Sequence, residues 1–338
     1  MGASVALSPS DPFGRELRWP LHSSTLRQPQ VLANAVERSY VPLPEQQLQT
    51  SQEEPSPAVG VAPCEPANSG DVKGITKREI IDIEERAQPR TPVIYEVVRR
   101  MGEEELARPA VSLWWSGVAA GLSISFSLLA QAVLQTHLPE KSWSPLVVAA
   151  GYPAGFLLVV LSRQQLFTEN TITAVLPLFK SFTALNLGRV IRLWSVVFVA
   201  NMLGAFVAAL FFVFTPALSL ELRDGAFEIS RQMLTNSSSE MFFRGIPSGF
   251  LIAAMVWLVP NADTARFHMI SLLTYLIAVG GFTHIVAGSV EAFLLVLTGE
   301  LATGQLVGHF IMPVLAGNII GGTVLFALIS YAQVMREI

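Results

Sequence analysis

The stretch GGFTHIVAGSVE, residues 280–291, decides how this chain is organised. It places three glycines, Thr283 and the imidazole of His284 between the apolar runs MISLLTYLIAV and AFLLVLTG. As one straight helix, residues 267–298 would be about 48 Å long at ~1.5 Å per residue, against a hydrocarbon core of about 30 Å. We therefore expect a transmembrane helix that is broken here, with an ionisable side chain at the break.

The composition predicts an all-α integral membrane protein. The chain has 338 residues, of which 51% are hydrophobic and 14% are charged, whereas soluble domains carry about 25% charged residues. The net charge of -4 gives no support to nucleic-acid binding. The one cysteine, Cys64, excludes an intrachain disulfide and any multi-cysteine metal site. No nucleotide loop, metal cluster or nucleophile–base pair is apparent, so we expect neither an enzyme nor a cofactor.

The N-terminal part, residues 1–106, has a different composition. It is rich in Pro, Gln, Ser and Glu, and such a segment cannot bury enough apolar surface to become ordered. We expect a largely disordered cytoplasmic tail with short helices near 76–87 and 92–107. Thr76 and Glu79 form a capping-box pattern in the first helix, and Thr91 with Pro92 predicts the start of the second.

Residues 107–338 form the predicted membrane domain with six transmembrane helices. The expected spans are 110–134, 144–162, about 193–217, about 242–260, about 267–298 and about 306–333. The second span is interrupted by RQQLFTEN, residues 163–170, and the fifth by the opening stretch. Lys and Arg are concentrated at the span ends on the N-terminal side, which places both termini in the cytoplasm.

Two short strings recur in the same order. LFTEN and GFTHI share Phe-Thr at Phe167 and Phe282, and NMLG and NIIG share Asn-x-x-Gly at Asn201 and Asn318. The separations are nearly equal, so spans one to three are expected to repeat as spans four to six, inserted in the opposite direction. Inverted repeats with interrupted helices at matching positions are typical of transporters and mark the translocation site.

Polar residues of the two breaks should face the protein interior, because irregular backbone at membrane depth is tolerated only where protein or a water-filled cavity satisfies it. They are Gln164, Gln165, Thr168, Glu169, Asn170, Thr283 and His284. His284 is the histidine expected at mid-membrane, where ionisable groups are usually functional. An imidazole there can donate a proton to a weak-acid anion, and the neutral acid can then cross apolar constrictions.

Three further charged residues lie in or near the later spans. Arg244 lies at the start of the fourth span. Its side chain either extends to the membrane interface or gives the pore entrance a positive charge that attracts anions. Glu291 is expected to pair inside the bundle, and Glu300 lies near a loop.

The motifs LFTEN, RGI, GFTHIVAG and GNIIGG, in this order, resemble the formate/nitrite transporter family over residues 107–338. The resemblance implies an aquaporin-like fold, a homopentamer with one pore in each protomer, and passage of small monovalent anions and protons. It also implies an integral protein of the bacterial inner (cytoplasmic) membrane.

The resemblance further implies the residues of the pore. Thr168 and His284 would meet at its centre, Leu166 would narrow it, and Arg244 stands where the family usually has Lys. Tyr152 and Phe156 would line the outer approach. Thr283 and Gly288 replace the usual glutamate and asparagine, so the polarity around the central pair is expected to differ. The expected pore residues are His284, Thr168, Leu166, Phe167, Phe282, Thr283, Asn170, Arg244, Tyr152 and Phe156.

Two other functions are compatible with these features. An aquaporin-like pore for neutral solutes would keep the fold, although the Asn-Pro-Ala boxes typical of aquaporins do not occur. A membrane-anchored regulatory protein that acts through its tail would explain the length of residues 1–106.

Overall fold

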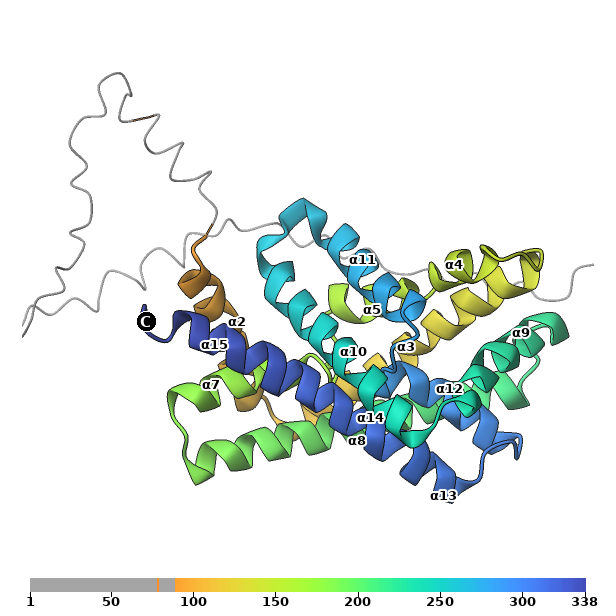
Figure 1. Cartoon of the computed structure of the whole chain (residues 1–338). Coiled ribbons are helices and arrows are strands. Elements are labelled where there is room, and N and C mark those ends of the chain that lie inside the picture. Colours follow the sequence, from red (N-terminus) through yellow and green to blue (C-terminus); the bar gives the residue numbers. More distant parts are fainter. Residues whose placement is uncertain (1–77, 79–88) are drawn as a thin grey trace, which may run out of the picture. The chain divides into compact units, whose positions relative to one another are not determined.

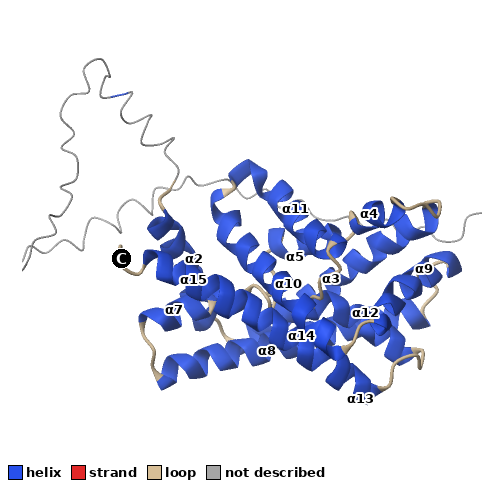
Figure 2. Cartoon of the chain, viewed as in Figure 1, coloured by secondary structure: helices blue, strands red, loops and turns tan. Residues whose placement is uncertain are grey.

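A computed structural model describes residues 78 and 89–338 of the chain. The helix expected near 76–87, apart from residue 78, and the predicted tail before residue 89 lie outside the described residues. Every regular element in the described part is a helix (Figure 2). This agrees with the predicted all-α class.

Long helices run through the molecule, and shorter ones lie at its two ends (Figure 1). The long ones are α3 (Ala110–His137), α8 (Ala184–Phe214) and α10 (Ser238–Leu258). The last span combines α13 (Thr303–Gln305), η4 (Leu306–Ile311), α14 (Met312–Ile319), η5 (Ile320–Ala327) and α15 (Leu328–Val334). One end carries α2 (Thr91–Ala107) and α7 (Val175–Lys180), and the opposite end carries α4 (Ser144–Ala149) and α9 (Leu220–Arg231).

Five helical segments of the described part are long and apolar enough to cross a membrane by length and composition. They are Ala110–His137, Ser144–Leu161, Ala184–Phe214, Ser238–Asn261 and Thr303–Val334. The remaining apolar helix, α12 (Ile285–Leu297), has 13 residues and is too short to span the bilayer alone.

Breaks occur at the two places that the sequence predicts. In the first, α5 (Pro153–Leu161) ends and a non-helical segment precedes the short α6 (Asn170–Thr173) and α7. In the second, α11 (Arg266–Val279) stops at Gly280, and α12 begins at Ile285. Gly281 has a φ of +61°, a conformation that glycine adopts without steric cost.

Several boundaries differ from the predicted ones because polar residues can extend a span beyond the hydrocarbon layer. Helix α8 starts at Ala184 rather than near 193, and the Thr183 hydroxyl caps it by accepting a hydrogen bond from Asn186 N at 3.2 Å. Helix α10 starts at Ser238, where Ser237 and Glu240 form a capping box. The amphipathic helix α9 lies between the expected third and fourth spans, where no helix was predicted.

Helix α2 packs on the membrane-spanning part, although its residues were assigned to the tail. It begins at Thr91, so Arg90 rather than Thr91 is the N-cap residue. Tyr95 and Val98 are buried in a cluster with residues of α6, α7, α10 and α15. Gly102 lies so close to α6 that a β-carbon on it would come within 1.8 Å of the Thr173 carbonyl oxygen. The compact unit therefore starts before residue 107.

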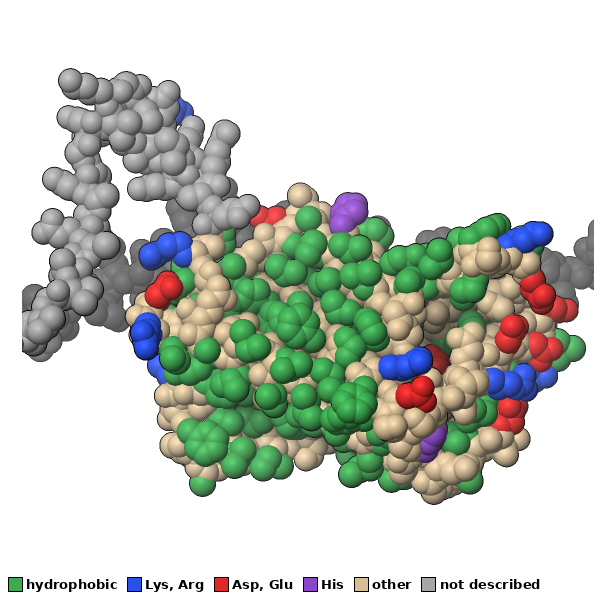
Figure 3. Space-filling view, in the orientation of Figure 1, with side chains coloured by type: hydrophobic (Ala, Val, Ile, Leu, Met, Phe, Trp, Pro, Cys, Tyr) green, Lys and Arg blue, Asp and Glu red, His purple; other side chains and the backbone are tan. Residues whose placement is uncertain are grey.

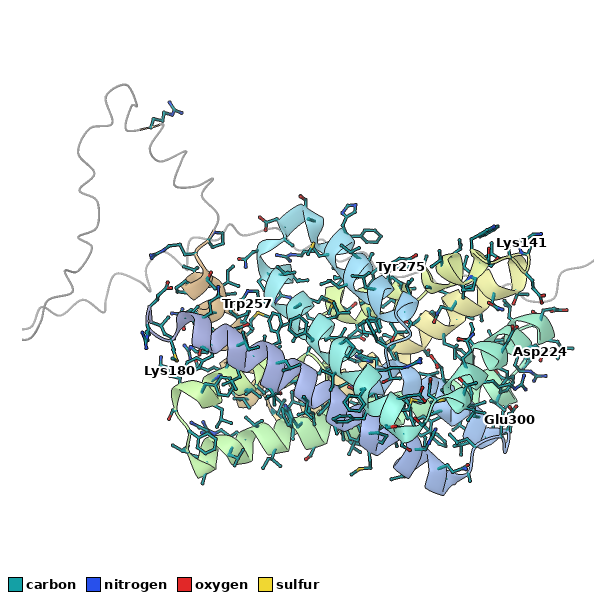
Figure 4. The ribbon with its side chains drawn as sticks, in the orientation of Figure 1. Lys141, Lys180, Asp224, Trp257, Tyr275 and Glu300 are labelled. Carbon is teal, nitrogen blue, oxygen red and sulfur yellow. The ribbon has the colours of Figure 1, made fainter. Side chains whose placement is uncertain are left out.

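The surface has the polarity expected of a bilayer-spanning protein. On the face shown in Figure 3, hydrophobic side chains cover the middle, and most Lys, Arg, Asp and Glu lie toward the two ends. Lys180 lies at the end with α7, whereas Lys141, Asp224 and Glu300 lie at the opposite end (Figure 4). Large apolar side chains such as Trp115, Phe211 and Ile329 are more than half exposed, which is stable only against lipid or another apolar surface.

Glycines allow the long helices to approach closely. A β-carbon on Gly121 of α3 would lie 2.2 Å from the Asn201 carbonyl oxygen of α8. A β-carbon on Gly249 of α10 would lie 2.2 Å from the Asn318 carbonyl oxygen of α14. Small residues at helix interfaces in membranes serve this close packing.

We expect Gly121→Ala to lower stability by about 1–3 kcal/mol, because the added methyl forces two helix backbones apart. Gly188→Ala is the matched control, since nothing lies within 4 Å of the added methyl on α8. Thermal unfolding of the detergent-purified protein measures both. Equal melting temperatures for the two variants would contradict the packing argument.

Candidate pore site

The two breaks meet at the side chains of Thr168 and His284. The Thr168 hydroxyl oxygen and His284 Nε2 are 2.8 Å apart. Thr168 is fully buried, and His284 is 2% exposed. Thr168 comes from the non-helical segment before α6 and His284 from the residue that precedes α12, so the contact joins the two interrupted spans.

The hydrogen bonds of His284 define its tautomer. His284 is the N-cap of α12, and its Nδ1 accepts a hydrogen bond from Ala287 N at 3.2 Å. A nitrogen that accepts carries no proton, so in the neutral ring the proton is on Nε2. Nε2–H therefore donates to the Thr168 hydroxyl oxygen, which leaves the Thr168 proton free to point elsewhere.

Asn201 of α8 holds the first break in place. Its side-chain oxygen accepts from Phe167 N at 2.9 Å. Its amide nitrogen donates to the carbonyl oxygens of Gln165 at 2.9 Å and Gly117 at 2.8 Å. Backbone groups that no helix satisfies are thus bonded inside the protein, as the low-dielectric interior requires.

Asn318 of α14 makes the same three bonds at the second break. Its side-chain oxygen accepts from Ile285 N at 2.9 Å. Its amide nitrogen donates to the carbonyl oxygens of Thr283 at 2.9 Å and Gly245 at 2.8 Å. Asn201 and Asn318 therefore have equivalent surroundings.

This shared pattern corrects the register of the two Phe-Thr strings. Phe167 occupies the place of Ile285 in the hydrogen-bond pattern, not that of Phe282, and Leu166 occupies the place of His284. The recurrence of Phe-Thr is thus offset from the structural match, whereas the recurrence of Asn-x-x-Gly coincides with it.

Apolar side chains lie around the histidine. The ring of Phe156 meets the His284 imidazole edge-on at a centroid distance of 5.0 Å, and Tyr152 lies 5.2 Å from Phe156. Leu166 is fully buried in the same core cluster as these aromatic residues. Water has little access to such surroundings, and a bare anion would be poorly solvated there.

A cavity of about 360 Å³ opens beside His284. We call it the Arg244 cavity; besides Arg244 and His284, its lining includes Tyr152, Phe282, Thr283 and Glu291. The Arg244 guanidinium reaches the second break, since a β-carbon on Gly281 would lie 3.4 Å from its Nη1. Within the described residues Arg244 forms no ion pair, so its charge faces the cavity.

Three predicted residues have other partners. Thr283 donates its hydroxyl to the Met241 carbonyl oxygen at 2.8 Å. Asn170 donates to the Gln165 side chain at 3.1 Å. Phe167 packs against Trp194 and Phe198, at centroid distances of 5.8 and 5.3 Å. The side chains of these residues bond or pack against groups other than the His284 ring.

Sequence reasoning did not include two polar residues of this region among the predicted pore residues. Glu291 lines the Arg244 cavity, although it was expected to pair inside the bundle. Glu105 of α2 accepts a hydrogen bond from the Thr173 hydroxyl at 2.5 Å, and burial raises the pKa of its carboxyl. Glu291 follows His284 by seven residues, and this spacing could have indicated that both lie on one side of a helix. The sequence around Glu105 gave no comparable indication.

Comparisons with known proteins agree with this architecture. The sequence profile described as formate/nitrite transporter matches residues 92–332. The inner membrane protein YfdC of Escherichia coli (strain K12) is 47% identical over 254 residues, which cover 75% of this chain and 82% of that protein. The formate channel FocA of Haemophilus influenzae is 26% identical over 244 residues, covering 64% and 84% of the two chains.

A solved structure extends the likeness to the fold. A pentameric formate channel with formate bound superposes with a TM-score of 0.58 at 19% identity, covering 68% of this chain and 98% of that one. The family is one of transporters, which confirms the expectation that the protein is not an enzyme. Together with the apolar helices, the profile match identifies an integral membrane protein that belongs to the formate/nitrite transporter family.

Proposed function

We propose that the protein is a transmembrane channel or transporter for small monovalent weak-acid anions of the formate and nitrite type. The hydrogen bond between Thr168 and His284 carries this proposal. It joins two helix breaks deep in the protein, beside a cavity lined by Arg244, which has no ion pair among the described residues. A proton-bearing group at this depth suits a substrate that crosses in its neutral form.

We also propose that six spans form two inverted three-helix repeats of the aquaporin-like kind. The equivalent bonds of Asn201 and Asn318 support this arrangement, since each side chain belongs to the third span of its half and holds the break of that half. The second and fifth spans are then the interrupted ones, as in other transporters with internal repeats.

The transport cycle follows from charge and desolvation. Arg244 attracts an anion into the cavity, because an opposite charge in a narrow, low-dielectric space raises the local anion concentration. Phe156 and Leu166 then oppose its entry, since an isolated charge in apolar surroundings costs tens of kcal/mol. A proton from His284 makes the anion neutral and removes most of this barrier, and Thr168 hydrogen-bonds the acid as it passes.

The tautomer of His284 defines what proton transfer requires. Neutral His284 can share its Nε2 proton but cannot release it without leaving an imidazolate. Transfer therefore needs Nδ1 to release Ala287 N–H and bind a proton first. The ring then passes through the imidazolium form, which donates from Nε2 and leaves its proton on Nδ1. A new proton on Nε2 and release of the Nδ1 proton restore the resting tautomer.

The proposed assembly is a homopentamer with one pore in each protomer, placed in the bacterial inner membrane with both termini in the cytoplasm. The solved pentameric formate channel and the inner membrane relative support it. The exposed apolar side chains of the described spans give such a pentamer both lipid-facing and subunit-facing surfaces.

We expect His284→Asn to reduce anion uptake by about 10²-fold or more, the usual size of a lost acid–base group. Asn caps helix N-termini well, so it should keep the bond to Ala287 N while removing the proton. Uptake of formate, acetate, nitrite and hydrosulfide into proteoliposomes measures this. His309→Asn is the control, because His309 bonds Ser238 at an exposed site. Unchanged uptake in His284→Asn would refute the mechanism.

We expect Arg244→Ala to raise the KM for the transported anion about tenfold, with a smaller change in the maximal rate. The reason is that the arginine concentrates the anion in the cavity rather than altering its chemistry. Arg244→Lys should restore most of the affinity, and the exposed Arg336→Ala serves as the control. Concentration-dependent uptake at low salt separates the two parameters. A KM that is the same in Arg244→Ala would count against an anion-attracting cavity.

A further inference from the structure

Glu291 is a titratable group that the transport cycle leaves unused. It lies seven residues after His284, two helical turns or about 10 Å along the axis, on the same side of α12. Both residues line the Arg244 cavity. A carboxyl and an imidazole thus share one polar space inside a membrane-spanning bundle.

Glu291 is unpaired in the part of the chain that the structure describes: no ion pair or hydrogen bond holds its carboxyl there. Glu300 at the surface offers a contrast, since Arg231 binds both its oxygens at 2.7 and 2.8 Å. Ionisable side chains inside a membrane bundle are rare and usually mark ion pathways or proton relays. A free carboxyl that lines a cavity is suited to exchanging protons with water.

The cavity is large enough to hold water between the two groups. Its volume is about 360 Å³, whereas one water occupies about 30 Å³ in the liquid. Several waters can therefore bridge the two helical turns. The arrangement of a carboxyl, a short water chain and an imidazole is sufficient to conduct a proton.

The hydrogen bonds of His284 create the need for such a group. Its neutral ring uses Nδ1 as an acceptor and Nε2 as a donor. After it protonates an anion it must gain a new proton, and the apolar neighbours Phe156 and Leu166 supply none. The source has to lie on the cavity side.

We propose that Glu291 is the proton-exchanging residue of this pore, which takes protons from the solution at the cavity mouth and returns them to His284. This inference rests on the proposed transport function and adds a residue to it. Glu291 acts through His284 and does not contact the anion at the constriction, so it is a positioning and relay residue.

The steps balance. The O–H bond of the Glu291 carboxyl breaks, and the proton passes through cavity water to form an N–H bond on His284. His284 then gives a proton to the anion, forming an O–H or S–H bond on the neutral acid. The Glu291 carboxylate takes a proton from the solution. One anion and one proton leave the solution and cross together.

Other titratable groups on the elements packed against α12 do not line the Arg244 cavity, and on α9 these include Glu221, Arg223 and Asp224. On α9, Arg231 binds Glu300, and Glu228 accepts from Gln135 at 3.0 Å. His137 of α3 bonds the Val133 carbonyl oxygen, and His309 of η4 bonds Ser238. The charged residues of α8, Arg189 and Arg192, lie in its first turns at the opposite end. The groups that share the cavity with Glu291 are Arg244, Tyr152 and His284.

The test measures formate uptake by the reconstituted full-length protein between pH 5 and pH 8. We expect Glu291→Gln, which keeps the shape but cannot exchange a proton, to lower uptake at least tenfold and to flatten its pH profile. Glu291→Asp should recover pH-dependent uptake. Glu300→Gln is the control carboxyl and should behave as the wild type. Size-exclusion chromatography verifies that each variant assembles as the wild type does.

The outcomes separate the two proposals. If the wild-type protein moves none of the anions, the proposed function is wrong. If it moves them and Glu291→Gln keeps the wild-type rate and pH profile, the role of Glu291 alone is overturned. If Glu291→Gln and Glu291→Asp both assemble correctly and lose uptake equally at every pH, the carboxyl has a structural role and the relay is also overturned.

Discussion

The structure depends on one constraint, that backbone amides outside helices must find partners where water is scarce. Both breaks lie deep among apolar helices, and in each a single asparagine side chain bonds the backbone on either side of one residue. Those two residues are Leu166 and His284. The constraint therefore does more than stabilise the breaks, because it determines which side chain each break presents at its centre.

The two asparagines make equivalent hydrogen bonds, but the residue that each pair of bonds flanks differs, Leu166 in one break and His284 in the other. The site is therefore asymmetric. One break presents a leucine and, two residues later, Thr168; the other presents His284. The proton-bearing group is thus contributed by one half of the bundle and its hydroxyl partner by the other. Helix α12 adds Glu291 on the same side as the histidine, so the acid–base groups belong to the second half and the apolar narrowing at Leu166 and Phe156 to the first.

The features that the sequence predicts are those that depend on local chemistry. Glycines and a histidine between apolar runs predict the second break. The approach of Thr168 to His284, in contrast, is what the family resemblance implies. The structural alignment of the two Phe-Thr strings could not be predicted from the sequence. It depends on hydrogen bonds to α8 and α14, which are distant in sequence from the breaks. Helix α9 and the docking of α2 were not predicted for the same reason. Their apolar faces are buried by helices that are distant in sequence, and the local sequence does not identify those partners.

A single imidazole at the meeting point of the breaks has a consequence for energetics. On the proposed mechanism each crossing uses one proton of His284 and one anion, so the passage is electroneutral with a stoichiometry of one to one. Membrane voltage then exerts no net force on the substrate. The distribution of the substrate at equilibrium then depends on the pH difference alone. For equal anion concentrations, the net flow is directed from the more acidic side to the less acidic side.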